Sequence, residues 1–208
     1  MAYLGRGTVS LDPTPANPVS LRLAATDPSR DINIIYLARP CQYTKLLDED
    51  EPCPLRYWTT ARFSERVIAS MNHAVDLVKQ YHGSRHIELV GFSGGAAVAL
   101  LIAARRDDVR SVRTVAGNLN HAALNAYHGV SPLDESLNPV DRADKLAEIP
   151  QTHFMGAEDR IVPPRHYESY ARAFSDRSCL QKDVVPVSHT QGWEVRWPGL
   201  VARAPECR

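Results

Sequence analysis

The feature that most constrains the fold of this chain is a glycine-rich turn, Gly91-Phe92-Ser93-Gly94-Gly95, between two apolar stretches. The residues before the turn (IELV) are typical of a buried strand. The small residues after it, Gly94 to Arg106, are typical of a helix. A strand that turns directly into a helix needs positions without Cβ atoms where the two approach, and glycine supplies them. We therefore expect a βα unit whose turn lifts the Ser93 side chain clear of a sheet.

The rest of the chain repeats this alternation of short β-branched runs and longer helical patterns, which predicts a mostly parallel sheet covered by helices. The predicted strands are Ala2–Leu4, Asp31–Leu37, His86–Val90, Ser111–Ala116, Thr152–Met155 and Asp183–Val187. The predicted helices are Asn17–Ala25, Thr60–His82, Gly94–Arg106 and one near Pro164–Ser175. We expect residues 1–208 to form one α/β domain, a three-layer α/β/α sandwich with about six strands.

Composition excludes several classes of partner. The 208 residues carry no formal net charge, and the sequence pI is about 7.1. Nucleic acids and membrane surfaces favour proteins with one sign of surface charge, so neither is expected here. No stretch of about twenty apolar residues is present, which predicts no membrane span. The oligomeric state is left open.

The four cysteines leave two interpretations open. Cys41 and Cys53 flank a polar loop, and Cys179 and Cys207 bracket the last predicted strand and the tail. An even number fits two disulfides in an exported protein, but four free thiols in a cytosolic enzyme fit equally well. No pair has the spacing of a zinc site, so we expect no metal.

Ser93 is the candidate nucleophile, and it needs a base because a serine hydroxyl is by itself a poor nucleophile. In proteins that carry this turn, an acid and a histidine follow from loops after later strands. His189 directly follows the run Val184–Val187 and fits the base. Glu158 and Asp159 follow the strand before it and are the candidate acids. His121 and His128 lie in the irregular segment 117–150, where they would overhang the site.

The Gly94 N–H begins the helix after Ser93 and can stabilise an oxyanion. A second donor is expected from the loop after an early strand. The Arg6 N–H is preferred for it over the turn Ala38–Gln42, which more readily lines the pocket. Further substrate contacts are expected from Phe92, Arg39, Asn118 and His121.

Beyond these motifs, the chain resembles the α/β-hydrolase superfamily over nearly its whole length. The phrases RPCQY (39–43), YWTTARFSERV (57–67), TVAGNLNH (114–121) and PLDESLNP (132–139) resemble small bacterial hydrolases, often exported or lipid-anchored, whose substrates are generally unassigned. The resemblance favours Asp159 over Glu158, because the family pattern is G-x-x-D-x-x-V-P. It also implies a minimal cap at 117–150 and a periplasmic or secreted location, with a cytoplasmic one still open. The usual first two strands are missing unless they were removed upstream.

The expected function is hydrolysis of a carboxylic ester through an acyl-enzyme, without a cofactor. The small cap favours a short acyl group. Two alternatives remain open: the same triad acting on thioesters or amides or in acyl transfer, and a catalytically silent domain that binds a small molecule.

Overall fold

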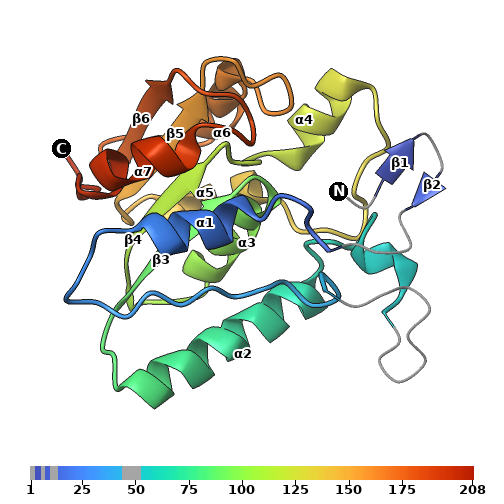
Figure 1. Ribbon diagram of the computed structural model, residues 1–208. Helices are drawn as coiled ribbons and strands as arrows, with labels where there is room; N and C mark the ends of the chain where they lie inside the picture. The colour runs from blue at the N-terminus through green and yellow to red at the C-terminus, as the bar shows by residue number, and fades with distance from the viewer. Residues whose placement is uncertain (1–2, 6–7, 10–13, 44–52) are drawn as a thin grey trace.

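A computed structural model describes residues 3–5, 8–9, 14–43 and 53–208 of the chain (Figure 1). Its strands are β1 (Tyr3–Gly5), β2 (Thr8–Val9), β3 (Ile87–Phe92), β4 (Val109–Val115), β5 (Gln151–Gly156) and β6 (Leu180–Val185). Its α-helices are α1 (Val19–Thr26), α2 (Glu65–His82), α3 (Gly94–Ala103), α4 (His121–His128), α5 (Ala143–Leu146), α6 (Tyr167–Ala171) and α7 (Trp193–Val201). Short 3₁₀ turns lie at Leu55–Tyr57, Pro139–Arg142 and Pro164–His166.

The main sheet is parallel throughout, in the order β3-β4-β5-β6. The predicted α/β class with a mostly parallel sheet is therefore confirmed, although this sheet has four strands where about six were expected. All four strands point the same way, so the residues that follow them gather at one edge. In open α/β sheets this carboxyl edge is where functional groups meet.

Helices cover both faces of the sheet. On one face α1 and α7 lie side by side, as Figure 1 shows in blue and red. Their buried side chains, Trp193 and Trp197 among them, pack on Val115, Phe154 and Val185. On the other face, residues of α3 and α6 pack on β4 and β5. The helix α2 packs outside α3, so α3 has neighbours on every side.

The composition of α3 follows from this position. Its ten residues, GGAAVALLIA, are buried from Ala96 to Ala103, and a helix enclosed on all sides has no polar face. The small side chains allow the sheet and α2 to approach it from opposite directions. Although α3 is strongly apolar, no helix in the described part of the chain is long and apolar enough to cross a membrane.

Two predicted strands of the sheet are wrong. Residues 31–37 run between α1 and α2 in Figure 1 and do not pair with the main sheet. Ile32 and Ile35 stay 59% and 44% exposed, whereas Leu37 packs against the cluster between α2 and α3. The predicted strand Ala2–Leu4 overlaps β1, but β1 pairs antiparallel with β2 in a separate two-stranded sheet and not with the main sheet. The edge strand β3 accordingly keeps Val90 exposed.

The segment 117–150 was expected to be irregular, but it contains α4 and α5. Asn120 caps α4 by accepting the Ala123 N–H at 3.2 Å, and Gly129 ends it with φ of 61°. Both are ordinary helix-terminal signals. The prolines of the segment concealed them, since they lie outside α4 and interrupt the pattern around it.

Two disulfides answer the question that the cysteine count left open. Cys41 is bonded to Cys53, and Cys179 to Cys207. The first closes the loop that precedes the 3₁₀ turn Leu55–Tyr57, and the second ties the C-terminal tail to the start of β6. Cross-links of this kind stabilise a fold mainly by restricting the unfolded chain.

A buried histidine in β5 makes the stability of this fold depend on pH. His153 is enclosed between Thr114 and the rings of Tyr167 and Tyr170, and its Nδ1 lies 2.8 Å from the Thr114 hydroxyl. Burial lowers the pKa of His153 to about 3, and it lowers that of His166 to about 4. Both side chains are therefore neutral in the folded protein near neutral pH.

We expect the free energy of unfolding to fall as the pH is lowered from 6.5 towards 4. In that range the unfolded chain binds protons at these histidines and the folded protein does not. Each of them can contribute up to about 1.4 kcal/mol per pH unit. Urea unfolding at several pH values measures this slope. His153→Gln should reduce it, and an unchanged slope in that variant would contradict the assignment.

Candidate active site

Each strand of the main sheet is followed at its carboxyl end by a candidate site residue. Ser93 follows β3, Asn118 comes after β4, Asp159 after β5 and His189 after β6. The sheet order brings together residues that lie up to 96 positions apart in the sequence. Parallel strand direction alone is sufficient to collect them at one edge.

Ser93 has a strained backbone held from both sides. Its φ of 51° and ψ of −117° lie in a region that residues with a Cβ atom rarely occupy. The Ser93 N–H donates to the Val115 carbonyl at 2.9 Å, and the Ser93 carbonyl accepts the Asn118 N–H at 3.0 Å. The end of β4 thus fixes the peptide groups on both sides of the Ser93 side chain.

Ser93, His189 and Asp159 form a continuous hydrogen-bonded line. The Ser93 Oγ lies 3.1 Å from His189 Nε2, and His189 Nδ1 lies 2.7 Å from Asp159 Oδ2. Asp159 and His189 are only 4% and 8% exposed. The carboxylate fixes the proton on Nδ1, which leaves Nε2 facing the hydroxyl as an acceptor. This geometry can remove a proton from Ser93.

The acid is held by its own turn. Its second oxygen, Oδ1, accepts the N–H groups of Ile161 and Val162, both at 2.8 Å. Gly156 allows the turn to approach the histidine loop, because a Cβ atom there would lie 2.6 Å from the Val187 carbonyl oxygen. Both oxygens of Asp159 are therefore occupied, and the side chain has one orientation.

The histidine is positioned by aromatic side chains. The indole N–H of Trp193 donates to the His189 carbonyl at 3.0 Å, and Trp193 is fully buried at the start of α7. The Phe92 ring lies 5.1 Å from the imidazole, centre to centre. Phe92, expected to contact substrate, thus borders the base. The role of Trp193 was missed, although its position four residues after His189 is a usable signal.

The Gly94 N–H opens α3 and has no earlier carbonyl of that helix to bind, so it is available to a developing negative charge. Phe63 packs against this glycine: a Cβ on Gly94 would lie 3.3 Å from the Phe63 ring. The predicted helix Thr60–His82 includes Phe63, but the structure begins α2 at Glu65 and leaves Phe63 in the preceding loop. Arg6, the preferred second oxyanion donor, lies outside the described residues.

The other expected substrate contacts are placed as follows. The Asn118 N–H donates to the Ser93 carbonyl, and its buried side-chain Oδ1 has no hydrogen-bond partner in the described part of the chain. His121 is buried at the start of α4, 6.2 Å from Phe63 between ring centres, and burial lowers the pKa of its imidazole. His128 is turned away to the Ile161 carbonyl, at 2.7 Å. Arg39 binds the backbone carbonyls of Tyr57 and Arg62.

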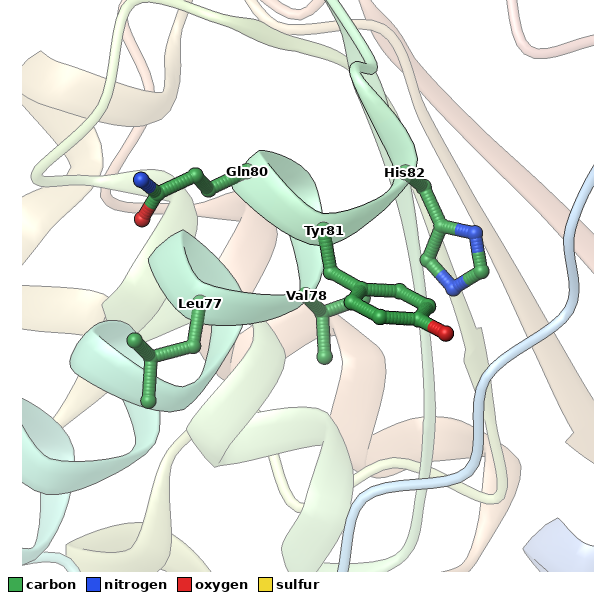
Figure 2. A pocket seen from close by; sticks show the side chains of 5 residues that line it. All are labelled: Leu77, Val78, Gln80, Tyr81 and His82. Atoms are coloured by element: carbon green, nitrogen blue, oxygen red, sulfur yellow. The ribbon is translucent and has the colours of Figure 1, made fainter.

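The structure has one hollow beside the Ser93–His189–Asp159 site and another far from it. One, of about 500 Å³, is lined by the acid turn Ala157–Arg160 and borders the site. The other, of about 570 Å³, lies at the end of α2, and Figure 2 shows the side chains that line it, Leu77, Val78, Gln80, Tyr81 and His82. Because α2 leads into the first residue of β3, this second hollow lies at the opposite edge of the sheet from Ser93. Among the described residues, no three His, Cys, Asp or Glu side chains are grouped as a metal site.

Comparison with protein families identifies the family of this chain. Residues 24–192 match the model of the family described as serine hydrolase (FSH1). The chain belongs to this serine hydrolase family. The matched range includes β3 to β6, Ser93, Asp159 and His189. No curated protein matches the chain.

Solved structures support the fold. An esterase of Pyrococcus furiosus aligns with a TM-score of 0.56 and 17% identity, over 69% of this chain and 62% of its own. The protein TT1662 of Thermus thermophilus gives 0.50 and 20%, over 65% and 60%. A puromycin-hydrolysing peptidase of Mycobacterium tuberculosis gives 0.51 and 18%, over 65% and 24%. The chain thus spans about three fifths of the first two proteins, and its fold is that of the α/β hydrolases.

Gly91 provides a test of the turn. A Cβ there would lie 2.4 Å from the Gly95 carbonyl oxygen and 2.6 Å from the Ala96 Cα, both backbone atoms that cannot move aside. We expect Gly91→Ala to lower the free energy of unfolding by at least about 2 kcal/mol, as overpacking does. The matched control is Gly199→Ala in α7, where a Cβ meets nothing within 4 Å. The control should stabilise by about 0.5–1 kcal/mol. Equal effects in chemical denaturation would contradict the close contact.

Proposed function

We propose that this serine hydrolase cleaves carboxylic esters through an acyl-enzyme, with Ser93 as nucleophile, His189 as general base and Asp159 as the group that orients the base. The observation that carries the proposal is the line from the Ser93 hydroxyl through His189 to the buried Asp159, with contacts of 3.1 and 2.7 Å. Family membership supports the reaction class. The proposal of an ester substrate draws on the Pyrococcus furiosus relative, which is an esterase.

The first half of the reaction forms the acyl-enzyme. The Ser93 Oγ attacks the ester carbonyl carbon while His189 Nε2 takes the hydroxyl proton. The carbonyl oxygen becomes an oxyanion, and the Gly94 N–H donates to it from the start of α3. The tetrahedral intermediate then breaks its bond to the alkoxy oxygen, which leaves as the alcohol with the proton from His189.

The second half releases the acid. Water replaces the alcohol, His189 Nε2 removes its proton, and the resulting hydroxide attacks the acyl carbon. The intermediate collapses with return of the proton to the Ser93 Oγ. In both halves Asp159 stabilises the imidazolium. Every proton is carried by this chain, so the reaction needs no cofactor.

The roles of the three residues can be tested with a fluorophosphonate probe and 4-nitrophenyl butyrate. Ser93→Ala should lose both labelling and turnover. Asp159→Asn should reduce kcat/KM by about 10³–10⁴-fold, because the amide cannot hold the proton on Nδ1. Glu158→Gln is the control, since it alters the neighbouring exposed carboxylate. If the intact protein is not labelled, the domain is a binding protein. Labelling without ester hydrolysis would favour thioesters, amides or acyl transfer.

The acyl length is a separate expectation. The short segment 117–150 leaves little chain to enclose a long tail, so a short acyl group is favoured. We expect kcat/KM for 4-nitrophenyl acetate and butyrate to exceed that for the decanoate and longer esters. A series of 4-nitrophenyl esters at concentrations below their micelle limit measures this. Faster hydrolysis of the long esters would refute a compact substrate.

A further inference from the structure

Arg39 is a half-buried cation whose described partners are all neutral. Its Nη1 donates to the backbone carbonyls of Tyr57 and Arg62, the latter at 3.4 Å. A guanidinium has five N–H groups, and Nη1 supplies two of them. The other three are on Nη2 and Nε, and one N–H of each forms the side edge of the fork, which can bind a carboxylate in a bidentate manner. None of these three donates to an acceptor in the described part of the chain.

The surroundings disfavour the charge that Arg39 carries. Burial lowers the pKa of Arg39 to about 10, and the neighbouring Arg62 guanidinium lowers it further in the same direction. The group is still protonated at neutral pH. The Glu135 carboxylate, which contacts the loop before α2, already accepts hydrogen bonds from the Thr60 hydroxyl at 2.7 Å and from Arg56 at 3.4 Å. Buried charges are costly unless an opposite charge accompanies them.

The position of Arg39 connects it to the nucleophile. One of its two carbonyl partners belongs to Arg62, and the next residue is Phe63, the side chain that packs on Gly94. Ser136 ties this loop to the segment 117–150, because its Oγ donates to the Thr60 carbonyl and accepts the Phe63 N–H. Arg39 is therefore linked through Arg62 and Phe63 to Gly94, whose N–H would hold the oxyanion.

The turn that carries Arg39 is fixed. Its N–H donates to the Gln42 side chain at 3.1 Å, and its carbonyl accepts the Gln42 N–H at the same distance. The disulfide Cys41–Cys53 anchors the turn, and the buried Trp58 donates its indole N–H to the Cys41 carbonyl at 2.5 Å. A cation that is already held in place loses little entropy when an anion binds to it.

We propose that Arg39 binds a carboxylate at the far end of the acyl group, so that the enzyme prefers short esters of dicarboxylic acids over uncharged esters of equal length. This inference rests on the proposed ester hydrolysis. A carboxylate matches the planar Nη2–Nε edge and supplies a negative charge that no described residue gives to Arg39. It also agrees with the short acyl group expected from the sequence.

The test compares two substrates of the same length, 4-nitrophenyl hydrogen glutarate and 4-nitrophenyl pentanoate. The natural enzyme should show a kcat/KM at least about tenfold higher for the charged ester, the usual scale for a hydrogen bond to a charged group. The difference should lie mainly in KM and shrink as salt is added. Arg39→Gln, whose amide can still donate to a backbone carbonyl, should abolish the preference. Arg110→Gln, at the opposite end of β4, is the control and should keep it.

Two results would overturn the inference: equal kcat/KM for the two esters in the natural enzyme, or an unchanged preference in Arg39→Gln. A variant that only melts at a lower temperature, with its preference intact, would make Arg39 a structural tie. If neither ester is hydrolysed in a manner that Ser93→Ala abolishes, the proposed function fails instead. In that case the site is tested by binding: glutarate, but not glutaramide, should raise the melting temperature of the natural protein and not that of Arg39→Gln.

Discussion

The arrangement of the site depends on one constraint, the strained backbone of Ser93 clamped by the end of β4. A residue with φ of 51° and ψ of −117° costs roughly 1–3 kcal/mol, and it persists only where its surroundings fix it. Here the Val115 carbonyl and the Asn118 N–H fix it from two sides. Between them Ala116 also takes a positive φ, 48°, so the clamp is itself strained. The well-packed sheet supports both strained positions and thereby aims the hydroxyl at His189.

A comparison of His153 and His189 shows how the surroundings of a buried imidazole determine whether it can act as a base. His153 and His189 are both buried, and both make a hydrogen bond at Nδ1. His153 is enclosed by the neutral Thr114 hydroxyl and two tyrosine rings, and this burial keeps the imidazole uncharged. The partner of His189 is a carboxylate, and its Nε2 faces a hydroxyl. Only the second environment stabilises a positive charge that appears during a reaction. Arg39 presents the converse case, a cation on neutral carbonyls, and a carboxylate of the substrate would complete it.

Several elements followed from local sequence because their causes are local. The strand, the glycine turn and the helix around Ser93 need only neighbouring residues, and the structure has them as β3 and α3. The run 31–37 is apolar enough for a buried strand, but it does not join the described sheet, and Ile32 and Ile35 stay largely exposed. An apolar composition allows a segment to be buried, but the packing of other elements against it determines whether it is. The helix α4 was missed because Pro132 and Pro139 made the whole segment 117–150 look irregular, although both prolines lie after the helix.

The sequence alone determined the α/β class, the turn that exposes Ser93, and the order in which an acid and a histidine follow it. These are properties of residue type and spacing, and they act within a few positions. Tertiary structure decided the rest. It showed that Ser93, His189 and Asp159 lie within hydrogen-bond reach, and it paired the cysteines. It also placed Phe63 on Gly94 and left one edge of Arg39 without an acceptor among the described residues. Each of these depends on contacts between segments far apart in the chain, whose geometry is fixed only when the sheet and its helices pack together.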